Sequence, residues 1–361
     1  MTMNSTSLIG APAKNPHPPA LRATPFTGGL KTAVCLVLLW CAAVAAQESG
    51  GAALPPPAKG LEVARLGANP TIRPDMLPGQ DGKNINGPSL IRVPAWLPKP
   101  LGKYYLYFAD HHGDYIRLAY ADQLSGPWKI HKPGTLRLKQ VRDGKAHVAS
   151  PDVLVDEERK ELRMYFHSPS KTTGKQTSYL ARSTDGLHFT AEAERLGPFY
   201  FRVFQYGGYW YAMSKRGWLC RSKDGVTAFE EGPNPFPIVA KPDGAENGPG
   251  MRHVAVDLSG DTLTVYYSNI GDMPECILRS TIALVPDWKD WKAGPPELVL
   301  KPEKDYEGAE LPLARSVAGS AKGRENALRD PAIFKEDGRT WLLYSVAGEN
   351  GIGIAELKET K

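Results

Sequence analysis

One pattern repeats five times between Leu61 and the C-terminus, and it constrains the fold more than any other feature of the chain. Each repeat has an apolar strand, a polar or glycine turn, an aromatic-rich second strand, a short loop and a third strand. The second strands are the clearest part, at residues 104–110, 162–168, 209–215, 263–269 and 341–347. Small antiparallel sheets that repeat in this way form the blades of propellers. The sequence therefore predicts an all-β fold, a five-bladed β-propeller over residues 61–361.

The third strands give independent evidence of repetition. Three of them carry an Arg-Ser pair in equivalent places, at residues 182–183, 221–222 and 279–280. The last repeat lacks an outer strand, and residues 61–66 could supply it. That pairing would close the ring by joining the two ends of the domain.

The first 60 residues lie outside the repeats. Residues 1–46 end in an unbroken apolar run from Thr32 to Ala46 that follows Lys31, which is typical of a signal peptide. The run is shorter than the roughly 20 residues of a membrane span, although an uncleaved anchor stays open. Residues 47–60 are rich in Gly, Ala and Pro and are expected to form an exposed linker with no packing role. We expect a secreted or periplasmic protein without a membrane span after cleavage.

Charge and cysteine content argue against a nucleic-acid-binding protein and against a domain held by several disulfides. The formal net charge is only +5, and no Lys/Arg block tracks along a helix, so nucleic acid is not an expected partner. Only Cys220 and Cys276 lie outside the apolar leader run, so no disulfide framework is implied. We expect both to be unpaired, because their strands belong to different blades. The protein is expected to be a monomer.

Polar residues gather where the inner strands begin. Aligned on their turns, Gly87, Ser150, Arg252 and Asp330 open corresponding strands in four blades, with Tyr200 in the third. Inner strands line the channel of a propeller, so their starts converge around its mouth. The converging set is Asn86, His147, Ser150, Asp152, Arg202, Arg252, His253, Arg329 and Asp330. Such a set either holds neighbouring blades together through Asp–Arg pairs or binds a hydroxyl-rich ligand.

The segment from Leu328 to Leu357, LRDPAIFKEDGRTWLLYSVAGENGIGIAEL, resembles a blade of the five-bladed glycoside hydrolases of families 43, 32, 68 and 117. In those families an Asp-Pro pair opens an inner strand and its Asp faces the substrate. The resemblance implies that role for Asp330, with Arg329 gripping sugar hydroxyls. The chain departs from the pattern in its first blade, where Gly87 stands in place of the expected carboxylate.

Glycoside hydrolysis needs two carboxyl groups across the scissile bond. Asp152 and Asp330 are the expected base and positioning carboxylate, and a loop glutamate must supply the acid. Glu307 is favoured over Glu246, because its loop leads into the blade of Asp330, although an exposed loop glutamate is often plain surface. Glu275 next to Cys276 imitates an invertase pair, but it falls on a predicted outer strand and is interpreted as coincidence.

A run of Asp110, His111, His112, Gly113 and Asp114 joins two strands of the first blade. It is expected to reach over the cleft, where one histidine would contact the ligand. Adjacent histidines point in different directions and lack the spacing of a zinc site, so simple turn formation is the alternative. No cofactor is predicted, and a structural divalent ion such as calcium stays open.

Three functions compete. The first is a secreted glycoside hydrolase acting on an oligo- or polysaccharide in the central cleft, with substrate-binding residues Asn86, His111, His112, His147, Arg202, Arg252, His253 and Arg329. The second is a carbohydrate-binding propeller without turnover, which the missing first-blade Asp favours. The third is a polysaccharide lyase, in which Arg202 or Arg252 would neutralise a uronate while His147, His253 or a tyrosine moves the proton.

Overall fold

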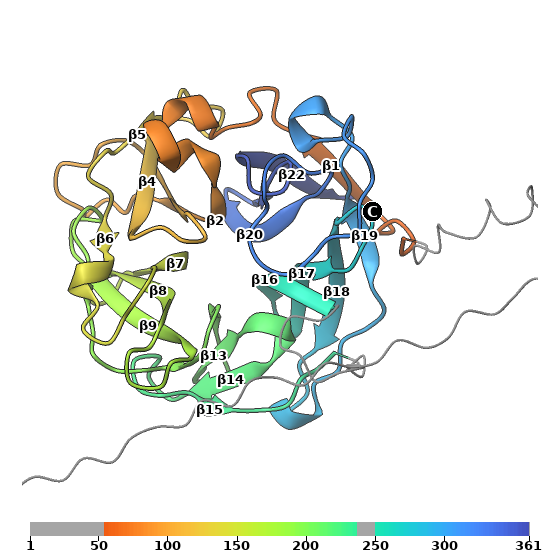
Figure 1. Cartoon of the computed structure of the whole chain (residues 1–361). Coiled ribbons are helices and arrows are strands. Elements are labelled where there is room, and N and C mark those ends of the chain that lie inside the picture. Colours follow the sequence, from red (N-terminus) through yellow and green to blue (C-terminus); the bar gives the residue numbers. More distant parts are fainter. Residues whose placement is uncertain (1–53, 237–249, 361) are drawn as a thin grey trace, which may run out of the picture. The chain divides into compact units, whose positions relative to one another are not determined.

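The computed structural model describes residues 54–236 and 250–360, and within these ranges it is built from five antiparallel sheets arranged in a ring (Figure 1). Helical structure among these residues is limited to short 3-10 turns at Pro74–Met76, Gly79–Lys83, Leu138–Gln140, Lys215–Gly217, Trp288–Asp290 and Asp305–Glu307. The prediction of an all-β, five-bladed propeller is confirmed. No helix in the described part of the chain is long and apolar enough to cross a membrane.

Each blade runs from an inner to an outer strand in chain order, and blades one to three come first. Blade one has β2 (Asn86–Arg92), β3 (Tyr104–Ala109), β4 (Tyr115–Ala121) and β5 (Lys129–Ile130), with β6 (Leu136–Arg137) also pairing β4. Blade two has β7 (Ala149–Asp156), β8 (Glu161–Pro169), β9 (Gln176–Ser183) and β10 (Thr190–Ala191), with β11 (Gly197–Pro198) also pairing β9. Blade three has β12 (Arg202–Tyr206), β13 (Tyr209–Met213), β14 (Leu219–Ser222) and β15 (Glu230–Glu231).

Blades four and five complete the ring. Blade four has β16 (Gly250–Ser259), β17 (Thr262–Ile270), β18 (Ile277–Ala283) and β19 (Glu297–Leu300). Blade five has β20 (Arg329–Glu336), β21 (Arg339–Ser345), β22 (Ile352–Glu359) and, as its outer strand, β1 (Leu61–Arg65). Strand β1 pairs with β22 from Leu61 opposite Glu359 to Arg65 opposite Ala355. The expected closure of the ring by the two ends of the domain is therefore confirmed.

Alternation along the second strands explains how neighbouring blades bind each other. On β3, Tyr105 and Tyr107 are buried against blade two, while Leu106 and Phe108 are buried against blade five. A strand that is apolar on both faces in this way must be covered on both sides. Five buried clusters result, one at each interface between neighbouring blades. Each fully buried aromatic or aliphatic side chain contributes roughly 1.5–3 kcal/mol, so these interfaces hold the ring together.

The structure describes only part of the predicted N-terminal signal peptide and linker, namely residues 54–60. The predicted signal peptide and residues 47–53 of the predicted linker lie outside the described residues. The expectation that the linker has no packing role is wrong for residues 54–60. Pro56 and Ala58 exchange backbone hydrogen bonds of 2.8 Å with Leu298 at the edge of blade four, and Leu54 packs on the core between blades three and four. Backbone groups left unpaired on an outer strand favour such an addition.

The two cysteines in the described part of the chain are both free and buried, as predicted. Cys220 lies on β14, and Cys276 directly precedes β18. Burial raises the pKa of each thiol to about 12, so both remain protonated and inert at neutral pH.

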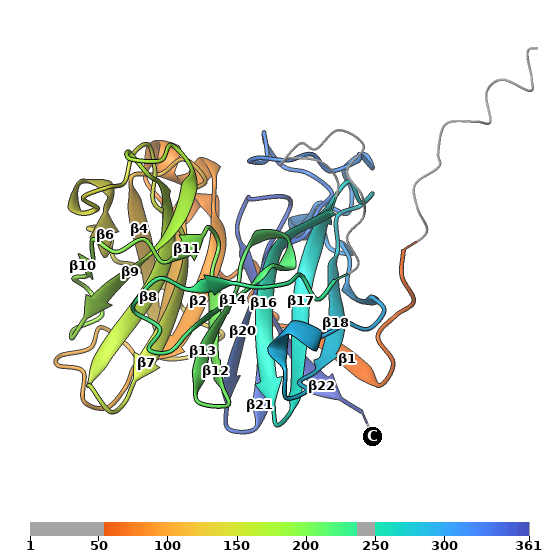
Figure 2. The ribbon, with the colours of Figure 1, turned by 90° about the horizontal axis from the view of Figure 1, so that it is seen from below.

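Figure 2 shows the sheets from the side, with their strands running roughly along the axis of the ring. Strands β2, β7, β16 and β20 surround its centre (Figure 1). The first residues of these inner strands therefore meet at one end of the axis, which we call the strand-start end. It is here that the sequence places its polar residues.

Candidate functional site

The inner strands of four blades begin with the same irregularity. The pairing register slips by one residue between Asn86 and Ser89, Ala149 and Asp152, Met251 and Val254, and Arg329 and Ala332. Such a bulge turns a side chain away from strict alternation. The bulge residues Gly87, Ser150 and Asp330 have φ values of 59°, 52° and 48°, and Tyr200, just before β12, has 74°. The alignment of these positions in the sequence is therefore a real structural equivalence.

A cavity of about 290 Å³ opens at the strand-start end, and its walls come from several blades. Blades one and two contribute amide, hydroxyl and imidazole groups, blade three contributes an ammonium, and blade four contributes a guanidinium and an imidazole. The polar side chains that matter below are Asn86, His111, His167, Lys215, Arg252 and His253. None of the described residues that line the cavity is a carboxylic acid.

Asp330 lies directly behind this wall with a side chain that is 0% exposed. Its carboxylate contacts Nδ1 of His253 closely and accepts a 3.0 Å hydrogen bond from the Ser345 hydroxyl. The Tyr200 ring stacks on the His253 ring, with centroids 3.9 Å apart and planes within 5°. Asp330 and Tyr200 thus fix the imidazole in one orientation, and Nε2 becomes the ring nitrogen available to the cavity.

His253 is neutral at pH 7. Burial lowers its pKa well below the usual value, and the nearby bases Arg252, His111 and Lys215 lower the pKa further. A neutral imidazole whose Nδ1 is held by a carboxylate can accept a proton at Nε2. This is the arrangement of a general base whose orientation is set by a buried acid.

A buried ion-pair network holds the strand starts of blades four and five. Glu275 is completely buried and binds Arg252 through two hydrogen bonds of 2.7 and 3.2 Å, and Arg329 through one of 2.8 Å. Arg252 also donates from Nη1 to the Gly319 carbonyl and from Nη2 to the Val317 carbonyl. The expected place of Glu275 on an outer strand is wrong, because it precedes β18 and its backbone bridges to Ala327, just before β20. Arg252 is held by this network and lines the cavity.

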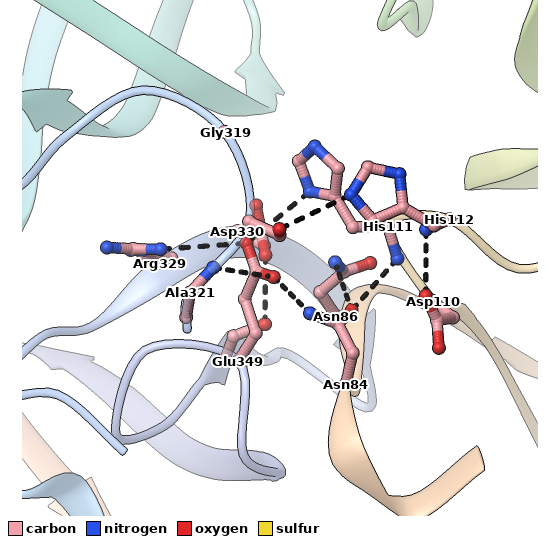
Figure 3. A network of polar contacts seen from close by, with 12 residues as sticks. Asn84, Asn86, Asp110, His111, His112, Gly319, Ala321, Arg329, Asp330 and Glu349 are labelled. Carbon is pink, nitrogen blue, oxygen red and sulfur yellow. Dashed lines mark hydrogen bonds and ion pairs between the residues drawn. The ribbon is translucent and has the colours of Figure 1, made fainter. Parts of the chain in front are cut away.

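Glu349, in the turn between β21 and β22, was not predicted as a site residue. Burial alone would raise its pKa, but interaction with His111, Arg329 and Asn84 lowers the pKa to about 2. It also accepts a 3.2 Å hydrogen bond from the backbone N–H of Ala321 (Figure 3). An acid within GENG between two strands carries no pattern that separates it from a surface turn, so the sequence offered little signal.

Histidines form a chain of neighbouring rings along the blade-two side. The ring centroids of His111 and His112 are 5.1 Å apart, those of His112 and His147 6.3 Å, and those of His147 and His167 5.7 Å. Burial, and then the neighbouring His111 and His112, lower the pKa of His147 to about 4. His167 was missed by the sequence argument, although it is a polar residue near the end of the aromatic strand LRMYFHS. Residues 54–236 and 250–360 contain no group of three ligands suited to hold a metal ion.

Asp152 and Arg202 do not line the cavity. Asp152 accepts a 2.8 Å hydrogen bond from the backbone N–H of Val203, and burial raises its pKa while Arg202 partly offsets the rise. Arg202 is 3% exposed, its guanidinium lies 4.7 Å from the Tyr200 ring centroid, and its Nε and Nη2 find no hydrogen-bond partner in the described structure. Both residues therefore lie between blades two and three, behind Ser150.

The expectation that Glu307 supplies an acid from an exposed loop is corrected. Its side chain is 0% exposed and is held by Arg65 at 2.7 Å, by the Tyr344 hydroxyl at 2.9 Å and by the backbone N–H of Glu303 at 2.8 Å. This cluster ties the outer strand β1 to β21 and is not part of the cavity. The alternative acid, Glu246, lies outside the described residues.

The predicted site residues thus fall into three groups. Asn86, His111, Arg252 and His253 line the cavity. His112, His147, Arg329 and Asp330 contact the lining residues or their partners. Arg202 touches the lining only through the Ser150 backbone carbonyl, and Asp152 and Glu307 are not part of the cavity. A common cleft for all the polar strand-start residues was expected, and the structure instead places several of them behind its wall.

Comparison with known proteins identifies one relative and several solved structures with a similar fold. No family model matches it. An uncharacterized protein of Acanthamoeba polyphaga mimivirus is 41% identical over 297 residues, which cover 76% of this chain and 83% of the relative. Solved structures with a similar fold include a β-1,2-mannobiose phosphorylase from Listeria innocua, at a TM-score of 0.54 and 12% identity over 82% of this chain and 97% of that one.

Two family 43 enzymes are similar in the same way. A β-xylosidase/α-arabinofuranosidase from a compost microbial metagenome has a TM-score of 0.51 and 14% identity over 77% of this chain and 92% of that one. An enzyme from Xanthomonas citri in complex with xylose has a TM-score of 0.51 and 12% identity, over 76% of this chain and 88% of that one. At these identities the likeness shows the fold. The chain therefore belongs to the family of the mimivirus protein and has the five-bladed propeller fold seen in these glycosidases and the phosphorylase.

Proposed function

We propose that this protein is a carbohydrate-active enzyme that binds a saccharide in the strand-start cavity and cleaves a glycosidic bond there. The observation that carries the proposal is the pairing of His253 with Asp330 in the wall of a polar cavity. Residues that only hold neighbouring blades together do not require an oriented, neutral imidazole at a cavity surface. The fold adds support, because proteins of similar architecture include glycosidases and a phosphorylase.

The roles follow from which atoms reach the cavity. His253 lines it and would exchange a proton with the substrate or with an attacking water. Asp330 is fully buried and would act through His253, so it is a positioning residue. Asn86 and Gln176 also line the cavity and offer amide groups for sugar hydroxyls.

Hydrolysis by two carboxyl groups is the more specific version of this proposal. It would use Asp330 together with Asp152, whose raised pKa suits an acid. Both would have to reach the ligand, and neither lines the cavity. This observation favours a second candidate, a propeller that binds a saccharide in the same cavity without cleaving it.

A product screen separates the candidates. The protein is incubated with a panel of polysaccharides, and both released reducing ends and the absorbance of unsaturated sugars are measured. Product from the wild type that falls at least about 100-fold in His253→Gln supports the proposal, since proton transfer contributes on that order. The control is His188→Gln, because the His188 side chain is 84% exposed and pairs only locally with Asp185.

The other outcomes are equally informative. Reducing ends would assign hydrolysis, and unsaturated products would assign elimination, the lyase alternative. Binding of a polysaccharide without product would establish the non-catalytic candidate. Neither product nor binding across the panel would show that the proposal is wrong.

A further inference from the structure

Three of the described carboxylates near the cavity, those of Asp330, Glu275 and Glu349, lie behind its wall. Asp330 faces His253 and Ser345, Glu275 faces two arginines, and Glu349 faces His111, Asn84 and the Ala321 backbone. Exposure of these three side chains is 0%, 0% and 1%. Each carboxylate pairs with protein donors, although Oε1 of Glu349 makes only ion-pair contacts of 3.6 Å with His111 and Arg329. Among the described residues, the lining therefore presents donors to a ligand and no carboxylate.

The groups that do face the ligand are of the opposite kind. The ammonium of Lys215, the guanidinium of Arg252 and the rings of His111, His167 and His253 all line the cavity. The amides of Asn86 and Gln176 line it as well. Neutral sugars are usually gripped by a mixture of acceptors and donors, because each hydroxyl both donates and accepts. Side-chain acceptors here are amide oxygens, a hydroxyl and neutral imidazole nitrogens, and no described lining residue carries a negative charge, whereas Lys215 and Arg252 carry positive charge.

A further cation lies just beneath this surface. Arg202 is 97% buried, donates a 3.1 Å hydrogen bond to the Phe201 carbonyl, and leaves Nε and Nη2 without a partner in the described structure. Its Nη1 also lies 3.4 Å from the carbonyl oxygen of Ser150, a residue of the cavity wall. An incompletely satisfied buried guanidinium is costly; Asp152 offsets part of that cost, and an anion in the cavity would lower it further.

The lowered pKa values of two cavity histidines point to the same positive charge. After burial, the groups that lower the pKa of His167 are His147, His111, Arg202 and Lys215, and all of them are bases. For His253 they are Arg252, His111, Lys215 and Arg202. Positive charge therefore acts on the cavity from blades three and four at once.

We propose that the ligand of this cavity is an acidic saccharide, one whose sugar carries a carboxylate, sulfate or phosphate group that is bound between Lys215, Arg252 and the cavity histidines. This rests on the proposed function and specifies its substrate class. The anionic group would accept charge-assisted hydrogen bonds, which are roughly twice as strong as neutral ones. The amides of Asn86 and Gln176 would remain for the hydroxyls.

The test uses sugar pairs that differ only in oxidation at one carbon. Binding of glucuronate and glucose, galacturonate and galactose, and mannuronate and mannose is measured by calorimetry on the full chain, with acetate and inorganic phosphate as anions without a sugar. We expect at least one acid to bind about tenfold or more tightly than its neutral partner, as one charge-assisted hydrogen bond would provide, and added salt to weaken it.

Two variants locate the charge. Lys215→Met should abolish the preference for the acid without changing the melting temperature by more than a few degrees. Lys129→Met is the matched control, because Lys129 is exposed on the short outer strand β5, and it should leave the preference intact. Unchanged preference in Lys215→Met would contradict the placement of the anionic group.

The remaining outcomes separate this inference from the proposed function. If neutral sugars bind as tightly as their acids, the inference is wrong while the proposed function stands. If acetate or phosphate binds as tightly as the acidic sugars, the site is an oxyanion site and the saccharide part of the inference is wrong. If no sugar of any pair binds, the proposed function itself is contradicted.

Discussion

Blades one and five begin their inner strands with the same backbone and with different chemistry. Both carry a one-residue bulge, and the bulge residue has φ near 59° in Gly87 and 48° in Asp330. In blade one the position is packed: a Cβ on Gly87 would lie 3.2 Å from the Ser150 Cα. In blade five the same position holds a carboxylate that orients His253. The bulge is thus a device of the fold, and the side chain placed on it decides the chemistry.

The same contrast extends to the two sides of the cavity. Blades one and two contribute uncharged groups and imidazoles, including the His147 and His167 pair. Blades four and five contribute the ion-pair network around Glu275 and the His253–Asp330 pair. One side supplies uncharged groups, and the other combines fixed charge with the neutral base His253. The predictions below test whether this division is real.

The largest effect on activity is expected from replacing the carboxylate of Asp330, which orients His253. Asp330→Asn should lower the rate of product formation by about 100-fold to 10,000-fold, because the amide cannot hold the His253 tautomer or stabilise its protonated form. The melting temperature should change by only a few degrees, since an amide oxygen still accepts from Ser345. A large loss of stability would show that Asp330 is a structural residue, and full activity with normal stability would contradict the positioning role assigned to it.

The second effect concerns stability on the charged side. Glu275→Gln should lower the free energy of unfolding by about 3–5 kcal/mol, because it leaves Arg252 and Arg329 buried without their shared carboxylate. Glu310→Gln is a control, since the Glu310–Arg324 pair is exposed and should contribute less than about 1 kcal/mol. Equal and small losses in urea denaturation would contradict the role assigned to the network.

The third effect probes the blade-one bulge. Gly87→Asp would place a carboxylate on the blade-one bulge, as Asp330 does in blade five, and it should cost about 2 kcal/mol because a non-glycine residue adopts positive φ there. Gly260→Asp separates the two causes: its φ is 55° and nothing lies within 4 Å of an added Cβ. A cost at Gly87 no greater than that at Gly260 would show that the Ser150 contact is unimportant.

The smallest effect is a pH dependence of folding stability caused by His147, on the blade-two side of the cavity. The pKa of His147 is about 4 in the folded protein and about 6.5 when unfolded, so the unfolded state binds more protons between these values. Stability should therefore rise as pH increases from about 4 to 6.5, with a slope of at most about 1.4 kcal/mol per pH unit from this residue, and should level off above. His147→Gln should reduce the slope in denaturation curves, and an unchanged slope would assign it to other groups.

The fold was predictable because its signals are local and repeated. The aromatic second strands recur with matching turns, and residues 61–65 pair where the last blade lacked a strand. The site was predictable only as far as the strand starts determine it, which is how Arg252, His253 and Asp330 were found. Side-chain direction at a bulge cannot be read from spacing, so acids expected in the cleft proved to lie behind its wall.

The misses have a common physical cause. Glu275, Glu307 and Glu349 all lie in irregular segments between strands, where the sequence gives neither period nor orientation. Glu307 was chosen because its loop leads to blade five, yet Arg65 from the other end of the domain captures it. Burial of a loop glutamate depends on partners distant in sequence, and only the assembled ring shows them.

The most direct test of the central claim is to follow the histidine side chains by nuclear magnetic resonance while a bound saccharide is titrated. The imidazole signals of His253, His167 and His111 should shift, because these rings line the cavity. The signals of His131 and His188, near the outer strands of blades one and two, should stay in place. Binding that moves His131 or His188 and leaves His253 unchanged would contradict the assignment of the strand-start cavity as the site.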